Sequence, residues 1–159
     1  MKIIKVKTFF QIISSILIIF FASNSFGYSQ EPLANIVLDN KSNSFEDALH
    51  VLNRCYTWNN MIAMMGNKLN NEYGDKVYNE YFEIALFFYN TIVDSLMEQG
   101  MKESIAEKNT QDKLVELDAK YRSDANKNIQ KYGEWFEGYF IGETGDANIC
   151  ERYYEKLKN

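Results

Sequence analysis

Residues 75–100 read DKVYNEYFEIALFFYNTIVDSLMEQG and carry apolar side chains at a helical period. One stripe recurs every three or four residues and consists of Val77, Tyr81, Ile84, Phe88, Ile92 and Leu96. A second apolar flank beside it consists of Tyr78, Phe82, Ala85, Tyr89 and Val93. We therefore expect a helix with Asp75 at its N-cap and Gly100 just past its end. Because two flanks are apolar, it should be the most deeply buried helix of the protein.

The residues before this stretch predict a first helix that begins at Ser44. Ser44 can cap it, and Asp47 three residues later is a variant of the capping box. One apolar stripe then consists of Phe45, Ala48, Leu52, Cys55, Ile62, Met65 and Leu69. Asn70, Asn71 and Gly74 are expected to end this helix.

The residues after Gly100 predict two more helices. The third should start near Thr110, with a narrow stripe of Leu114, Leu117, Tyr121, Ala125, Ile129 and Tyr132. The last should be capped by Asp146 and bury one face made of Ile149, Cys150, Tyr153, Tyr154 and Leu157. Since no sustained period-two run is present, the sequence predicts an all-α fold, a small four-helix bundle-like domain.

Cys55 and Cys150 are the two cysteines of the chain, and each lies on an apolar stripe. An isolated pair in an exported chain normally forms a disulfide, so we expect one that joins the first helix to the last. A redox-active role is not indicated, because no Cys-x-x-Cys pair is present to lower a thiol pKa.

The N-terminus has the pattern of a secretory signal. Three lysines, Lys2, Lys5 and Lys7, precede a short apolar run at residues 9–21, and small residues follow. We predict a signal peptide at 1–27, an extended arm or linker at 28–43 and one helical domain at 44–159. The expected location is therefore periplasmic or secreted, with no stable membrane span after cleavage.

The charge balance argues against nucleic acid as a partner. Loss of the signal removes three lysines and no acidic residue, so the net charge falls from −5 to −8. Basic and acidic residues are also interleaved along the chain, without the cationic face that nucleic acids require. The expected partner is instead another envelope or secreted protein, and the sequence leaves the oligomeric state open.

Metal and catalytic motifs are weak, and we predict no catalytic residue, no metal site and no cofactor. His50 is the single histidine and shares an expected polar face with Arg54 and Thr57, which indicates an exposed, unligated side chain. Met61, Met64 and Met65 crowd one stretch, and Met97 and Met101 follow. We interpret the methionines as core filler, and a thioether site for Cu(I) is the alternative.

The segment 133–145 is the best candidate for function. It holds four of the eight glycines together with Trp135, Phe136, Tyr139 and Phe140, which would share one face if the segment were helical. These four aromatic residues either cap the core or form a patch for a ligand or partner. We thus expect a non-enzymatic binding or interaction module. The alternative is a carrier or sensor of a small apolar ligand or a metal within the bundle.

Overall fold

The computed structural model describes Leu33 and residues 44–159. The predicted signal peptide and all of the predicted arm except Leu33 lie outside the described residues. The described part contains four α-helices, one short 3₁₀ helix and no strand: α3 Phe45–Leu69, α4 Glu72–Glu98, α5 Glu103–Tyr132, η1 Gly138–Phe140 and α6 Asp146–Lys158. The all-α prediction is confirmed.

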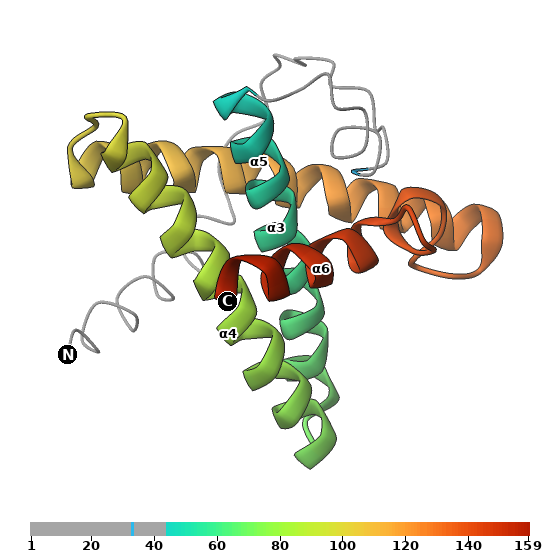
Figure 1. Cartoon of the computed structure of the whole chain (residues 1–159). Helices are drawn as coiled ribbons and strands as arrows, with labels where there is room; N and C mark the ends of the chain where they lie inside the picture. Colours follow the sequence, from blue (N-terminus) through green and yellow to red (C-terminus); the bar gives the residue numbers. More distant parts are fainter. Residues whose placement is uncertain (1–32, 34–43) are drawn as a thin grey trace.

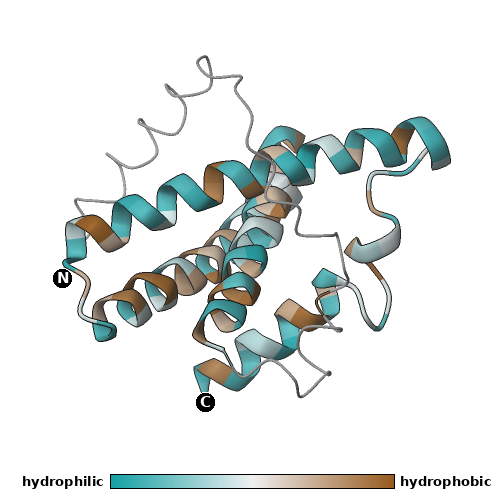
Figure 2. Ribbon diagram, turned by 90° about the horizontal axis from the view of Figure 1, so that it is seen from above, coloured by the Kyte–Doolittle hydropathy of each residue, from teal (hydrophilic) through white to brown (hydrophobic). Residues whose placement is uncertain are grey.

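Two of the helices form an antiparallel hairpin, and the other two α-helices cross this hairpin on opposite sides. Helices α3 and α4 run antiparallel, and the long α5 lies across them on one side while the short α6 lies across α3 on the other (Figure 1). The view from above separates α5 and α6 on opposite sides of the hairpin (Figure 2). Helix α3 therefore touches each of the other three α-helices.

This arrangement makes α3, and not α4, the most buried helix, so that prediction was wrong. Twelve residues of α3 are buried against five of α4. The second apolar flank of α4 is only partly covered, and the stacked rings of Tyr78 and Phe82 remain half-buried. A helix's own pattern measures how apolar it is, whereas burial depends on how many neighbours pack against it.

The helix boundaries confirm some expected caps and correct others. Ser44 caps α3, because its Oγ accepts from the Asp47 amide at 3.2 Å. Asn71 rather than Asp75 caps α4, with its Oδ1 accepting from the Gly74 amide at 2.8 Å. Gly100 follows the end of α4 with φ +88°, as expected.

Two further boundary predictions were wrong. Helix α5 begins at Glu103, seven residues before Thr110. The sequence pattern does not reveal this start, because the first turns of the helix carry few apolar side chains and show no clear stripe. The N-cap of α6 is Gly145, and Asp146 is its first helical residue. The Asp146 side chain is therefore free for a tertiary role.

The tip of the α3–α4 hairpin depends on two glycines. A Cβ added at Gly66 would lie 2.8 Å from the Gly74 carbonyl oxygen, and one added at Gly74 would lie 2.5 Å from the Gly66 oxygen. Both separations are below van der Waals contact. The two helices thus approach closely enough at this end that no side chain fits between them.

The disulfide between Cys55 and Cys150 is present, with an S–S distance of 2.07 Å. It joins α3 to α6, as predicted, and both cysteines are buried. Around it lies the hydrophobic core, which includes Trp58, Phe88 and Ile149. Leu33, from the predicted arm, is fully buried in the same core. At least this part of the arm therefore belongs to the folded domain.

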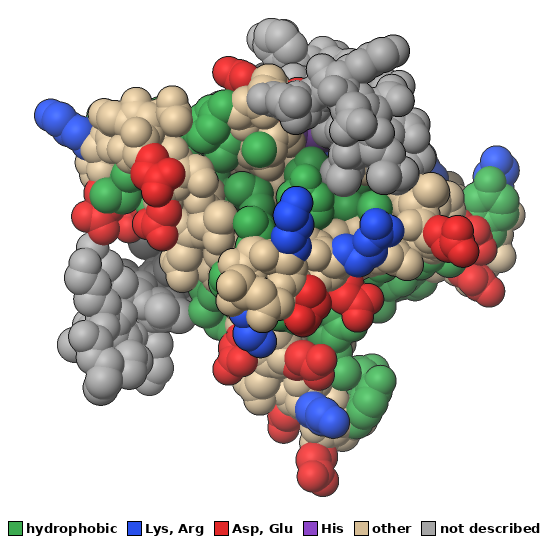
Figure 3. Space-filling model, in the orientation of Figure 1, with side chains coloured by type: hydrophobic (Ala, Val, Ile, Leu, Met, Phe, Trp, Pro, Cys, Tyr) green, Lys and Arg blue, Asp and Glu red, His purple; other side chains and the backbone are tan. Residues whose placement is uncertain are grey.

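The face shown in Figure 3 carries acidic and basic side chains side by side, with apolar side chains between them. This mixture agrees with the interleaved charges of the sequence. Among the described residues, none of the helices has the length and hydropathy needed to cross a membrane.

Candidate functional site

The segment after α5 turns back toward α3 and is not an α-helix. Gly133 ends α5 with φ +78°, and the chain then runs irregularly until the single turn of η1 at Gly138–Phe140. The expectation that four aromatic residues share one helical face was therefore wrong. Glycine at 133 is required because the left-handed backbone there strains other residues.

The structure divides these four aromatic residues between core and surface. Phe140 is fully buried, and its ring contacts Trp58, Tyr121 and Phe136 with centroid distances of 6.1, 5.4 and 5.6 Å. Phe136 is half-buried, with its ring 5.0 Å from that of Trp58. These contacts make the segment a lid on the core between α3 and α5, and only Trp135 of the four is an exposed side chain, at 44%.

Trp135 lines a cavity of about 210 Å³ that is partly open to solvent. The cavity lies between the second half of α3, the second half of α5 and the segment that follows α5. Its walls combine thioether, aliphatic, amide and cationic groups from Met61, Met64, Met65, Lys68, Arg122, Ala125, Asn126 and Trp135. We call these eight residues the Met–Trp groove. Met61 is buried, whereas Met64 and Met65 are half-buried. Of these three methionines, only Met61 therefore fully matches the expected role of core filler.

Beneath the lid lies a buried ion pair that the sequence did not predict. Arg54 Nη2 donates to Asp146 Oδ1 at 2.6 Å, and Arg54 Nε donates to Oδ2 at 3.1 Å. Tyr121 donates its hydroxyl proton to Asp146, and the Leu33 amide donates to the same carboxylate. Side-chain exposure is 5% for Arg54 and 0% for Asp146. Four segments of the chain thus meet at one carboxylate.

The pKa shifts follow from this burial. Burial raises the pKa of the Asp146 carboxyl, against the opposing effect of the Arg54 guanidinium and the Tyr121 hydroxyl. Burial, followed by the charge of Asp146, also raises the pKa of Tyr121 well above its usual value. Tyr121 therefore keeps its proton and stays a hydrogen-bond donor to Asp146 at neutral pH.

Tyr139 connects the lid to this ion pair. Its ring lies 5.3 Å from the Arg54 guanidinium carbon, and its hydroxyl donates to Asp124 Oδ2 at 2.9 Å. Asp124 in turn pairs with Lys127 at 3.0 Å. Since Tyr139 uses both its ring face and its hydroxyl in internal contacts, it attaches this segment to Arg54 of α3 and Asp124 of α5.

The expectation of a polar face at His50, Arg54 and Thr57 was wrong. Arg54 and Thr57 are buried, and His50 is half-buried. The pKa of His50 falls to about 4, first because burial disfavours the charged ring, and then because of nearby charges. The cations that lower it are Arg54, Lys113 and Lys120, and Asp47 opposes them. His50 is therefore neutral at neutral pH.

This pKa predicts a pH dependence of folding. Because the folded-state pKa lies below the ordinary value of 6.5, protonation favours the unfolded chain. The neutral ring thus contributes stability above pH 6.5 that is lost as the pH falls toward 4. Between pH 7 and 4.5, we expect the wild type to lose about 1–2 kcal/mol more than His50→Gln, a figure reduced for partial solvent access. Urea unfolding of both proteins at each pH measures this, and parallel curves would contradict it.

No group of three or more histidine, cysteine, aspartate or glutamate side chains within the described ranges is placed to hold a metal ion. The buried charged groups Arg54 and Asp146 satisfy each other in a fully enclosed setting, which is typical of a structural role. The Met–Trp groove, by contrast, exposes apolar and cationic groups to solvent. It is therefore the candidate site.

Comparison with known proteins gives no relative: no protein-family model matches the chain, and neither a curated protein nor a solved structure is significantly similar to it.

Proposed function

We propose that this protein is a non-enzymatic binding module that takes an apolar segment of another exported protein in the Met–Trp groove. The observation that carries the proposal is the position of Trp135, which is exposed and lines the same partly open cavity as the half-buried Met64 and Met65. Tryptophan is among the residues that most often dominate binding energy at interfaces. Of the four aromatic residues predicted to form the site, Trp135 is the one available to a partner.

The methionines of the groove suit it to an apolar partner. Met64 and Met65 are unbranched and polarisable, so they can adapt their shape to an incoming side chain at low cost. Flexible, methionine-rich surfaces are used by proteins that bind varied apolar segments. The groove thus supports a binding surface that reshapes around its partner.

The rim of the groove favours an acidic partner. Lys68 and Arg122 contribute cationic groups to the walls, although the protein as a whole is acidic. Arg122 is already paired with Asp118 at 2.7 Å, so Lys68 is the stronger candidate for a contact across the interface. An apolar side chain flanked by Asp or Glu matches both features.

A carrier of a drug-sized apolar molecule is less well supported. Pockets for such ligands usually enclose about 300–1,000 Å³ and bury most of the ligand. The Met–Trp groove measures about 210 Å³ and is partly open. This size fits one or two side chains of a partner better.

The proposed location is an oxidising compartment, the periplasm or the extracellular space. The Cys55–Cys150 disulfide supports it, because such bonds persist where thiols are not kept reduced. The partner should therefore be found among envelope or secreted proteins.

The test is selection of random peptides displayed on phage against the oxidised protein, followed by calorimetry with the best synthetic peptide. We expect enrichment of a large apolar residue next to Asp or Glu. Trp135→Ala should weaken binding about 30-fold or more, as truncation of a central tryptophan does. Lys68→Glu should weaken acidic peptides and favour basic ones.

Leu157→Ala is the matched control. Leu157 has the same exposed fraction as Trp135, 44%, but lies on α6 and outside the groove. Its truncation should leave the affinity unchanged. Equal binding by wild type and Trp135→Ala, or equal losses in the two variants, would count against the groove as the binding site.

A further inference from the structure

Three methionine thioethers lie on one face of α3, in the wall of the Met–Trp groove. Met61, Met64 and Met65 stand at positions i, i+3 and i+4, so the Cβ atoms of Met64 and Met65 each lie about 5–6 Å from that of Met61. All three line the same cavity, and Trp135 lines it as well. We propose that these thioethers form a binding site for a soft monovalent metal ion, Cu(I) or Ag(I).

The ligand chemistry selects this class of ion. Thioether sulfur is soft and uncharged, and it favours Cu(I) over Mg²⁺, Ca²⁺ or Zn²⁺. Each methionine has three side-chain torsions, so three sulfurs on adjacent turns can converge on one ion without movement of the backbone. Some metal ions need carboxylate, imidazole or thiolate ligands. Among the described residues, no group of three or more such side chains is placed to hold a metal ion.

The position of the methionines distinguishes them from core filler. Met61 is 4% exposed, whereas Met64 and Met65 are half-buried, and all three line the partly open cavity. An ion can therefore enter from solvent and still be shielded from it on the inner side. Trp135 can add a cation–π contact from the lid.

The cationic rim is compatible with a single positive charge. The Arg122 guanidinium is paired with the Asp118 carboxylate at 2.7 Å, which offsets its charge. Lys68 is exposed, and its flexible stem allows the ammonium group to stay in water. A divalent ion would meet twice the repulsion, which again favours a monovalent ion.

Titration of the purified, oxidised protein with Ag(I) nitrate in chloride-free buffer tests the proposal without redox chemistry. We expect a one-to-one adduct in the native mass spectrum and quenching of Trp135 fluorescence. The quenching should be lost in Trp135→Phe, which retains Trp58. Because thioethers do not titrate, binding should be equal at pH 5 and pH 7, where a histidine site would differ.

The decisive variant is the double replacement Met64→Leu with Met65→Leu. Leucine is close in volume to methionine, so the fold should be retained. Apparent Ag(I) affinity should fall at least about tenfold, since even groups that only support a metal ligand commonly have effects of this size. In the wild type, the ε-methyl carbon signals of Met64 and Met65 should shift in NMR spectra on addition of Ag(I).

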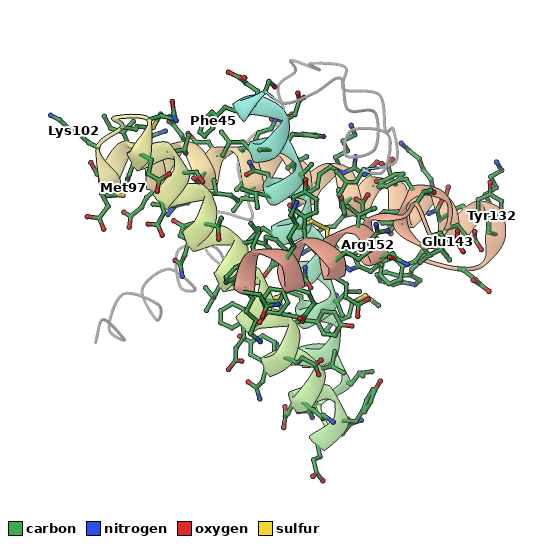
Figure 4. All side chains as sticks on the ribbon, viewed as in Figure 1. Phe45, Met97, Lys102, Tyr132, Glu143 and Arg152 are labelled. Carbon is green, nitrogen blue, oxygen red and sulfur yellow. A yellow bond between two sulfur atoms is a disulfide. The ribbon has the colours of Figure 1, made fainter. Side chains whose placement is uncertain are left out.

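The control is Met97→Leu with Met101→Leu. Met97 lies near Lys102, at the end of α5 opposite Tyr132 (Figure 4), and it does not line the groove. Met101 is close by in sequence and accepts a hydrogen bond from Asn109 at 3.4 Å. This pair should bind Ag(I) like the wild type. Absence of the adduct, unshifted Met64 and Met65 signals, or equal affinities in the two double variants would overturn the proposal. The titration uses the protein alone, so its outcome is independent of the proposed partner.

Discussion

Replacing Asp146 with asparagine should lower the free energy of unfolding by about 3–5 kcal/mol, the usual cost of removing one partner from a buried ion pair. Arg54 is charged at all accessible pH values and is almost fully buried, with 5% of its side chain exposed. In Asp146→Asn its charge would stay buried beside a neutral amide. Urea denaturation at neutral pH, followed by circular dichroism, measures the loss.

Two comparisons separate the buried charge from other effects. Lys108 and Asp112 form an ion pair of the same length, 2.6 Å, with side chains 72% and 67% exposed, so Asp112→Asn should change stability by less than about 1 kcal/mol. The double variant Arg54→Met with Asp146→Leu removes both charges and should recover much of the stability lost in Asp146→Asn. A stability of Asp146→Asn equal to that of the wild type would contradict this account.

The same ion pair shows where sequence reasoning stopped short. Arg54 precedes Cys55, and Asp146 lies four residues before Cys150, one turn away on the same face of α6. A disulfide between the two cysteines brings the helical turns that carry these opposite charges close together. Asp146 also matches the sequence pattern of an N-cap, and this local pattern hides its tertiary role.

The helices themselves were predictable because each carries an apolar stripe at a helical period. Their relative burial was not. Helix α4 has the more apolar sequence, yet α3 is buried more deeply because α4, α5 and α6 all pack against it. Such contacts are long-range, and no local pattern records which face meets which neighbour.

The sequence predicts a site in 133–145, and the geometry of this segment differs from the prediction. The composition of 133–145 is rich in glycine and aromatic residues, and a helical period would place Trp135 and Phe140 on one face. Gly133 and the irregular backbone after it send Phe140 into the core and leave Trp135 on the surface. The role proposed for the methionines depends on how exposed their side chains are, which only the three-dimensional structure shows.

The double replacement Cys55→Ala with Cys150→Ala should lower the free energy of unfolding by about 4–5 kcal/mol. The disulfide closes a loop with a sequence separation of 95, and the chain-entropy model gives a stabilisation of this size for such a loop. Since 0% of Cys55 and 1% of Cys150 are exposed, a reductant should reach the bond in the wild type only through unfolding. Urea denaturation of the oxidised wild type and the double alanine variant measures the difference, and a loss below about 1 kcal/mol would contradict the prediction.

The disulfide and the ion pair should also be energetically coupled, because both attach the beginning of α6 to the same turn of α3. When the disulfide is absent, α6 can move away from α3, and water can reach Arg54 in Asp146→Asn. The Arg54 charge then costs less free energy, because water solvates it. The triple variant combines Cys55→Ala, Cys150→Ala and Asp146→Asn. We expect its loss of unfolding free energy to be about 0.5–3 kcal/mol smaller than the sum of the losses in Asp146→Asn and in the double alanine variant, as found for neighbouring sites that share a structural element. Strict additivity would contradict this coupling between the disulfide and the ion pair.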